Sequence, residues 1–296
     1  MRERNTLVSR QYRKRSRAGE VWHRLKKNKG AMIGLGIIVL LALIAILADV
    51  LVDYDTQVIG MTLKDRLQHP SKAHIMGTDD LGRDIFARLL YGSRFSLSVG
   101  VVAVAIAVVV GVILGAFAGY YTGGIVEDII MRATDIFAAV PNMLMAIVIV
   151  AALGANTLNL MISVGVTSIP QFVRTTRAAV LTVTGQEYIE SARAIGESET
   201  KIIFKHILPN CLSPIIVRVT LRVSSAIISA SSLSFLGLGV PAPAPEWGSM
   251  LSSGRAYLRG YSYMTLFPGL AIMITVLAFN MVGDGLRDAM DPKLKK

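Results

Sequence analysis

Long uncharged runs dominate this chain and alternate with short blocks of charged residues. Five runs contain no Asp, Glu, Lys or Arg, and they cover residues 31–48, 95–126, 136–173, 223–245 and 260–283. A helix that crosses a bilayer needs about 20 apolar residues, so each run is long enough for at least one crossing. The pattern therefore predicts an all-α membrane protein.

The longest run, 136–173, is too long for one crossing, because its 38 residues would form a helix of roughly 57 Å. Gly154 and Asn156 favour a turn near its middle. Pro141 and Pro170 are expected to kink the helices on either side of that turn. The sequence thus predicts six spans, at about 31–48, 95–120, 136–153, 157–175, 213–238 and 262–283.

Basic residues are concentrated on one side of this arrangement. In total, 23 Lys and Arg fall on the side of the N-terminus and 8 on the other side. Because cytoplasmic loops are enriched in Lys and Arg, we expect both termini and the loop 176–212 to be cytoplasmic. The segments 49–94 and 239–261 then lie outside. The expected organisation is a basic tail of residues 1–30 and one six-helix membrane domain of residues 31–296.

The basic tail carries eleven of the cationic residues and explains most of the net charge of +11. Anionic lipid headgroups account for it more simply than nucleic acid, so the expected partner is the lipid bilayer and not nucleic acid. We expect residues 1–18 to be disordered. Residues 20–30 combine Val21, Trp22 and Leu25 with a basic face, which suits either a short helix at the inner interface or a plain juxtamembrane flank.

The outer segment 49–94 contains a turn-rich stretch, Gly77–Asp84 (GTDDLGRD). Thr78 or Asp79 is expected to cap a short helix that begins near Ile85 and has one apolar face. This helix should pack on the outer ends of the spans, with contact to an external partner as the alternative.

Glycines recur every four residues in the second predicted span, at Gly111, Gly115 and Gly119. Small residues at this spacing lie on one helix face and let two helix backbones approach closely. They predict close packing against another helix and carry no information about transport chemistry.

A charged, helix-prone block, Glu187–Asn210, lies inside the loop 176–212, between two apolar segments. In a chain this apolar, such a block must lie in water. It is therefore expected to be a docking element through which the membrane domain contacts a soluble partner.

Local signals predict the shape of this block. Thr184 and Glu187 match the T-x-x-E capping box that begins many helices, and the helix would run to about Ile195. Gly196 fits the left-handed position that ends helices. Ser198 is expected to cap a second helix of about ten residues. The prediction is a short, rigid helix–turn–helix outside the bilayer.

Charged residues near the ends of the spans predict two further features. Arg132 and Asp135, three residues apart, are expected to form an ion pair within the chain. Arg218 and Arg222 are expected to extend toward the cytoplasm, since an arginine at mid-membrane costs about 2.5–3.5 kcal/mol on insertion scales. The centres of the predicted spans then contain no ionisable residue.

Motifs of catalysis and nucleotide binding do not occur in the sequence. It contains no G-x-x-x-x-G-K-[ST], no H-E-x-x-H and no G-x-S-x-G. The four histidines are scattered and lack the spacing of a metal site. The chain is therefore not expected to be an enzyme by itself or to hold a cofactor or metal.

Several motifs together resemble one family. Glu190–Gly196 (ESARAIG), followed by Ile207–Pro209 (ILP), resembles the EAA loop of ABC importer permeases, although Ser191 stands where the general motif has Ala. The wider match resembles the second permease of the dipeptide/oligopeptide/nickel group and extends from about Trp22 to Pro292. Its further segments are Gly77–Asp84, Arg132 with Asp135 and Pro141, Arg174 with Arg177, Ser234–Gly239 (SFLGLG), Pro245–Gly248 (PEWG) and Gly283–Pro292 (GDGLRDAMDP).

The resemblance implies a type I ABC importer permease fold whose coupling helix sits in a groove of an ATPase subunit. Glu190 would make polar contacts there, Ser191 and Ala192 would allow close approach, and Gly196 would make the turn. The implied docking residues are Glu187, Glu190, Ser191, Ala192, Arg193 and Gly196.

The resemblance also implies partners and a location in the bacterial or archaeal cell membrane. A second homologous permease would complete the pore, two ATP-binding subunits would bind ATP and Mg, and an extracytoplasmic solute-binding protein would deliver substrate. Peptides are the expected substrate, with nickel or another small solute as the alternative. A secondary transporter and a membrane enzyme remain as readings from other classes; the former expects ionisable residues at the span centres and the latter an acid/base or metal cluster.

Overall fold

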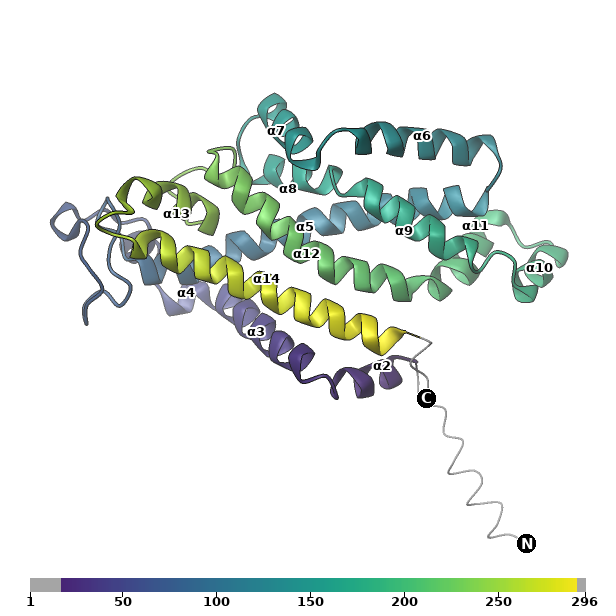
Figure 1. The fold of residues 1–296 in the computed structure, drawn as a ribbon, viewed down its shortest axis with the longest axis horizontal. Helices are drawn as coiled ribbons and strands as arrows, with labels where there is room; N and C mark the ends of the chain where they lie inside the picture. The colour runs from purple at the N-terminus through teal and green to yellow at the C-terminus, as the bar shows by residue number, and fades with distance from the viewer. Residues whose placement is uncertain (1–16, 292–296) are drawn as a thin grey trace, which may run out of the picture.

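The computed structural model describes residues 17–291 as a helical bundle, with no β-strand in that range (Figure 1). The all-α fold class is thus confirmed. Most of the tail that we expected to be disordered lies outside the described residues, as do the C-terminal lysines. The helices are α2 (Arg17–Leu25), α3 (Lys29–Ile46), α4 (Ala48–Leu51), α5 (Ile85–Tyr120), α6 (Ile125–Ala139), α7 (Asn142–Leu153), α8 (Thr157–Val166), α9 (Ile169–Leu181), α10 (Glu187–Ala194), α11 (Glu199–Lys201), α12 (Leu212–Phe235), α13 (Trp247–Gly254) and α14 (Tyr263–Met290).

Within residues 17–291, four helices are long and apolar enough to cross a membrane, namely α3, α5, α12 and α14. The pair α6 and α7 gives a fifth crossing if it is counted as one span, although a bend of 90° separates its halves. The predicted fourth span is divided into α8 and α9, with Thr167 and Ser168 between them. Four of the six predicted spans therefore form unbroken helices, the third becomes the bent pair α6 and α7, and the fourth, as α8 and α9, is not among the helices that are long and apolar enough to cross.

The two prolines act differently from the kinks that we predicted. Pro141 separates α6 from α7, because proline disfavours helical geometry at the residue before it, here Val140. Pro170 lies in the first turn of α9, where a missing N–H has no helical partner to lose. It therefore begins a helix and kinks none.

The expected outer helix and the second span form one continuous helix, the 36-residue α5. Its N-cap is Asp84, whose carboxylate accepts a hydrogen bond of 2.9 Å from the backbone N–H of Ala87. The predicted caps, Thr78 and Asp79, instead hold the preceding turn together. Asp79 does so by an ion pair of 2.7 Å with Arg83.

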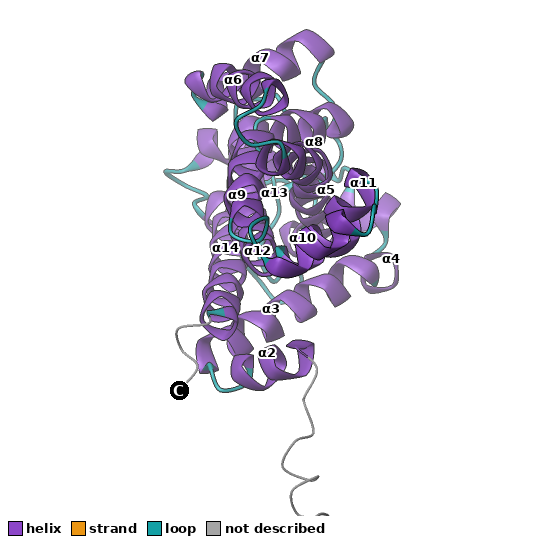
Figure 2. Ribbon diagram, turned by 90° about the vertical axis from the view of Figure 1, so that its right-hand side faces the viewer, coloured by secondary structure: helices purple, strands orange, loops and turns teal. Residues whose placement is uncertain are grey.

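The bundle has two distinct ends along its long axis. The helix–turn–helix containing α10 lies at one end, and α13 lies with the long α4–α5 connection at the other (Figure 1). We call these the α10 end and the α13 end. The α10 end faces the viewer in Figure 2, where α10 and α11 lie in front of the longer helices.

The helix expected at residues 20–30 is present as α2 and lies toward the α10 end (Figure 1). Leu25 is buried against Ala31 and Ala289, while Trp22 is exposed and lies under the Lys26 ammonium at 5.1 Å. One face of α2 therefore packs on the bundle, and the other presents an aromatic ring and positive charge.

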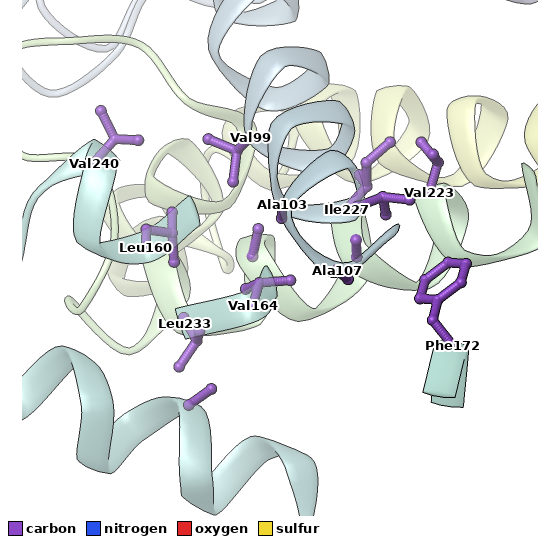
Figure 3. Packing of buried hydrophobic residues seen from close by; sticks show 14 residues of the cluster. Val99, Ala103, Ala107, Leu160, Val164, Phe172, Val223, Ile227, Leu233 and Val240 are labelled. Carbon is purple, nitrogen blue, oxygen red and sulfur yellow. The ribbon is translucent and has the colours of Figure 1, made fainter. Parts of the chain in front are cut away.

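The main core lies where α5 meets α8 and α12 (Figure 3). Ala103 and Ala107 are fully buried on α5, facing Leu160 and Val164 of α8 and Ile227 of α12. Small side chains on α5 allow the larger ones to fill the space between the helices. This packing holds α12 beside the interruption between α8 and α9.

The glycine series on α5 faces α9, which is its most extensive helix partner. A Cβ atom added at Gly111 would lie 2.5 Å from the Cβ of Phe172, and one at Gly115 would lie 2.5 Å from the carbonyl oxygen of Val173. Gly119 is equally close to α9. The two backbones therefore touch along three turns of helix, as the spacing predicts.

Replacing Gly115 by alanine should destabilise the protein, because the new methyl group would overlap the α9 backbone. Overpacking of this kind typically costs about 1–3 kcal/mol. Gly36→Ala is the matched control, since a Cβ there would meet no atom of the described residues within 4 Å and alanine favours helix. Thermal unfolding in detergent should show a lower midpoint for Gly115→Ala only; equal midpoints in the two variants would contradict the close packing.

Candidate functional site

The predicted helix of the charged block is α10, and it begins at Glu187 as expected. The predicted capping box is wrong, however. Gln186 occupies the N-cap, and its side chain makes no capping hydrogen bond to the described residues. Thr184 is still part of the turn that ends α9, because its N–H donates to the carbonyl of Val180 at 3.0 Å.

Gly196 ends α10 in the left-handed conformation, with φ of +80°, as predicted. Its N–H donates to the carbonyl of Arg193 at 3.0 Å, and the N–H of Glu197 donates to that of Ala192 at 3.2 Å. These two bonds are the Schellman pattern that closes a helix C-terminus. The space around a Cβ at this position is open, so backbone conformation and not crowding requires the glycine.

α10 has two different faces. Ile189 and Ala192 are buried against the chain's own core, at 0% and 6% exposure. Ala192 therefore packs inward, where its small side chain lets α10 lie close to the bundle. The outward face is exposed and mixes charge with small and apolar groups; its members are Glu187, Tyr188, Glu190, Ser191 and Ile195.

Arg193 connects α10 to the end of α5. Its guanidinium donates a hydrogen bond of 3.1 Å to the hydroxyl of Tyr120 and lies 5.5 Å from the centre of that ring. The Tyr120 hydroxyl also bonds to Glu199. The last residue of α5 thus contacts both halves of the helix–turn–helix. These contacts hold the loop against a long helix.

The second half of the block is less regular than the helix that we predicted. Ser198 is the N-cap of α11, but its side chain makes no capping bond within the described residues, and α11 ends after one turn. Residues 202–207 continue as wider turns, in which Ile202, Ile203 and Ile207 are fully buried. Widening the helix lets all three isoleucines face the core.

Glu197 is the centre of a cluster that sequence analysis missed. Its carboxylate contacts the Lys201 ammonium at 2.8 Å and the imidazole of His206 at 2.5 Å, with Lys205 at 3.9 Å. The hydrogen bond from Lys201, followed by that from His206, lowers the pKa of Glu197. Glu197 and Lys201 are four residues apart in the sequence, and this spacing could have predicted their ion pair.

Two ion pairs join α6 to α9. Asp135 contacts Arg174 at 2.7 Å, and Glu127 pairs with Arg177. The predicted pair of Asp135 with Arg132 is therefore wrong. Arg174 on the neighbouring helix pairs with the Asp135 carboxylate in place of Arg132 on the same helix, because α6 and α9 lie side by side.

Arg222 is buried in the middle of α12 and does not extend toward a helix end, so this prediction is also wrong. Its guanidinium donates two hydrogen bonds to the hydroxyl oxygen of Ser168, at 2.7 and 3.0 Å, and one to Ser225 at 3.2 Å. Ser168 lies in the interruption between α8 and α9. A near-central ionisable residue is thus present in a predicted span.

No group of three or more His, Cys, Asp or Glu in residues 17–291 is arranged to hold a metal ion.

The arrangement of helices is that of an ABC importer permease. A chain of the MetNI methionine ABC transporter, in an inward-facing crystal form, matches with a TM-score of 0.57 over 69% of this chain and 96% of that chain, at 18% identity. A second crystal form of MetNI matches with a TM-score of 0.55 over 70% and 98%, at 20% identity. At these identities the likeness defines the fold alone.

Sequence comparison then gives the family. The model of the binding-protein-dependent transport system inner membrane component matches residues 111–296, and that of the N-terminal TM domain of oligopeptide transport permease C matches residues 16–70. The chain belongs to the family of binding-protein-dependent transport system inner membrane components.

Its relatives match along nearly their whole length. The dipeptide transport system permease protein DppC of Alkalihalophilus pseudofirmus is 48% identical over 276 residues, which are 93% of this chain and 90% of that protein. DppC of Escherichia coli K12 is 46% identical over 284 residues, or 94% and 93%. The glutathione transport system permease protein GsiD of Escherichia coli O6:K15:H31 is 47% identical over 277 residues, or 93% and 90%.

Replacing Glu197 by glutamine should loosen the second half of the charged block, because the amide has no charge to pair with the Lys201 ammonium and is a weaker hydrogen-bond acceptor for His206. Backbone amides of residues 198–207 should exchange hydrogen faster at pH 7, while those of α5 stay protected. Since the folded pKa of Glu197 is lowered, its stabilising contribution is present at neutral pH and is lost as the pH falls through that pKa. Glu187→Gln is the control. Equal exchange rates in the two variants would contradict a stabilising role of the Glu197 cluster.

Proposed function

We propose that this chain is a permease subunit of an ATP-driven importer of small peptides, and that α10 is its coupling helix. The observation that carries the proposal is the two-faced helix itself. Its inner face is fixed to the bundle by Ile189 and Ala192, and its outer face presents Glu187, Glu190 and Ser191 to a partner. This partner would be an ATP-binding subunit, and the ATP and Mg would be bound by that subunit.

In the proposed assembly, two ATP-binding subunits, a second homologous permease and an extracytoplasmic solute-binding protein surround the chain. The α10 end faces the cytoplasm together with both termini, and the α13 end receives the binding protein. The excess of Lys and Arg on the side of the N-terminus supports this orientation. The family description supports the binding protein as a partner.

Force on α10 would reach the membrane helices by a short route. Arg193 and Gly196 keep the helix at a fixed angle to the bundle, since one binds Tyr120 of α5 and the other closes the helix end. α5 in turn lies backbone to backbone against α9 at Gly111 and Gly115. When the ATP-binding subunits close on ATP, α10 moves, and α5 and α9 move with it as one packed unit.

Small peptides are the proposed substrate because the relatives at 46–48% identity carry that function in their names. Two are dipeptide permeases, and one is a permease for glutathione, which is itself a tripeptide. Nickel or another small solute is the alternative within the same kind of importer, and the uptake assay below separates the two.

Glu190→Arg and Gly196→Pro should abolish substrate-stimulated ATP hydrolysis while leaving membrane insertion intact. The first reverses a charge on the proposed docking face. The second forces φ to about −65° where +80° is needed and removes the N–H that bonds Arg193. Asp128→Arg, a charge reversal at the exposed start of α6, is the control. Wild-type stimulation in both variants would refute docking through α10.

The complex reconstituted with its binding protein in liposomes should take up a labelled dipeptide in an ATP-dependent manner. Unlabelled peptides should compete for uptake, and nickel ions should not. Competition by nickel alone, without uptake of any dipeptide or tripeptide, would replace peptides by nickel as the substrate. Uptake without ATP would contradict the importer.

A further inference from the structure

A cavity of about 620 Å³ opens between α9, α12 and the end of α14, on the part of the bundle toward the α10 end. Thr175, Ser213, Arg218 and Leu221 line it, together with Arg287. Pockets that bind small ligands usually measure roughly 300–1,000 Å³, so the cavity is large enough for a short peptide.

Arg218 is the cavity residue whose bonding is incomplete. Its Nε atom is buried and has no hydrogen-bond partner among residues 17–291. No carboxylate in that range forms an ion pair with it either. A buried guanidinium N–H without a hydrogen-bond partner is costly, although the Arg218 side chain as a whole is only partly buried. The planar group is shaped for two parallel hydrogen bonds to a carboxylate.

Arg222 adds a second positive charge one helical turn further along α12. It is held in place by Ser168 and Ser225, and likewise no ion pair to a carboxylate is formed within residues 17–291. The two arginines are four residues apart and therefore share one helix face. Ser225, Ser229 and Ser232 continue the same face, so polar side chains extend along α12 from near its C-terminal end to the cavity at its N-terminal part.

The cavity has positive charge in excess. Among the described residues that line it, Arg218 and Arg287 face one carboxylate, that of Asp291, which has contacts of its own. Such a site selects for an anion that can accept hydrogen bonds from a guanidinium.

We propose that this cavity binds the C-terminal carboxylate of the transported peptide, with Arg218 as the residue that contacts it and Arg222 as a second positive charge on the same helix face. The choice of a peptide carboxylate rests on the proposed function; the anion site itself rests on the two arginines and the cavity. Because the cavity lies toward the α10 end, it would hold the peptide on the inner part of its route.

The test uses the complete transporter in lipid nanodiscs, without nucleotide and without the binding protein. The probes are alanyl-alanine and alanyl-alanine amide, which differ only at the C-terminal carboxylate. Titration followed by nuclear magnetic resonance gives a Kd for each. The wild type should bind the free acid roughly tenfold more tightly than the amide, a difference of about 1.4 kcal/mol. Arg218→Gln should remove this preference, Arg218→Lys should keep most of it, and Arg259→Gln, at an exposed arginine outside the cavity, should leave it unchanged.

Equal affinity of the wild type for acid and amide, or no binding of either at any soluble concentration, would overturn the inference without any variant. So would an unchanged preference in Arg218→Gln. If Arg218→Gln instead fails to assemble and Arg218→Lys restores assembly with no preference for the acid, the arginine pairs with a carboxylate of another subunit, and the inference falls. ATP-dependent dipeptide uptake by the wild type is measured separately, so a failed substrate assignment is distinguished from a failed anion site.

Discussion

The close approach of α5 and α9 is the contact on which the rest of the molecule depends. With Gly111 and Gly115 at the interface, no side chain separates the two backbones, and the helices cannot slide without collision. α5 extends over 36 residues, from the capping carboxylate of Asp84 to the hydroxyl of Tyr120 that holds α10. A single rigid element therefore connects the two ends of the bundle. In a bilayer, where burial of apolar surface gives little drive for helix association, such direct backbone packing has to provide much of the cohesion.

The break between α8 and α9 is tolerated in this bundle because side chains of the protein form hydrogen bonds there. Non-helical backbone at membrane depth is possible only when it is buried in protein or lines a polar space. Ser168 illustrates this condition. Its hydroxyl donates to the carbonyl of Val164 at 2.5 Å and accepts from Arg222, so one side chain links the end of α8 to α12. The buried arginine thus supports the broken helix, and the break provides the acceptor that makes the arginine tolerable.

Glycine positions and helical spacing were predicted well, whereas the helix caps at Thr184 and Ser198 and the contacts between distant residues were not. The positive φ of Gly196 follows from its place after a helical stretch, and the facing of Gly111 follows from helical spacing. Asp135 finds its partner 39 residues away, on a helix whose position the sequence does not reveal. Pro141 lies in an apolar run whose composition is the same whether the chain kinks or turns through 90°. Arg222 was misplaced because its cost was judged against lipid, whereas serine hydroxyls surround it.

Under the docking that we propose, the two faces of α10 separate the choice of partner from the transmission of movement. Ile189 and Ala192 fix how the helix sits on the bundle, whereas Glu187, Glu190 and Ser191 belong only to the surface. The outer residues could therefore change to suit a different ATP-binding subunit, while the inner residues and their packing on the bundle stay the same. If docking takes place as proposed, such a transporter could exchange or share its ATP-binding subunits over evolutionary time without a change in the pore, because the partner-binding side chains and the side chains that anchor the helix lie on opposite faces of one eight-residue helix.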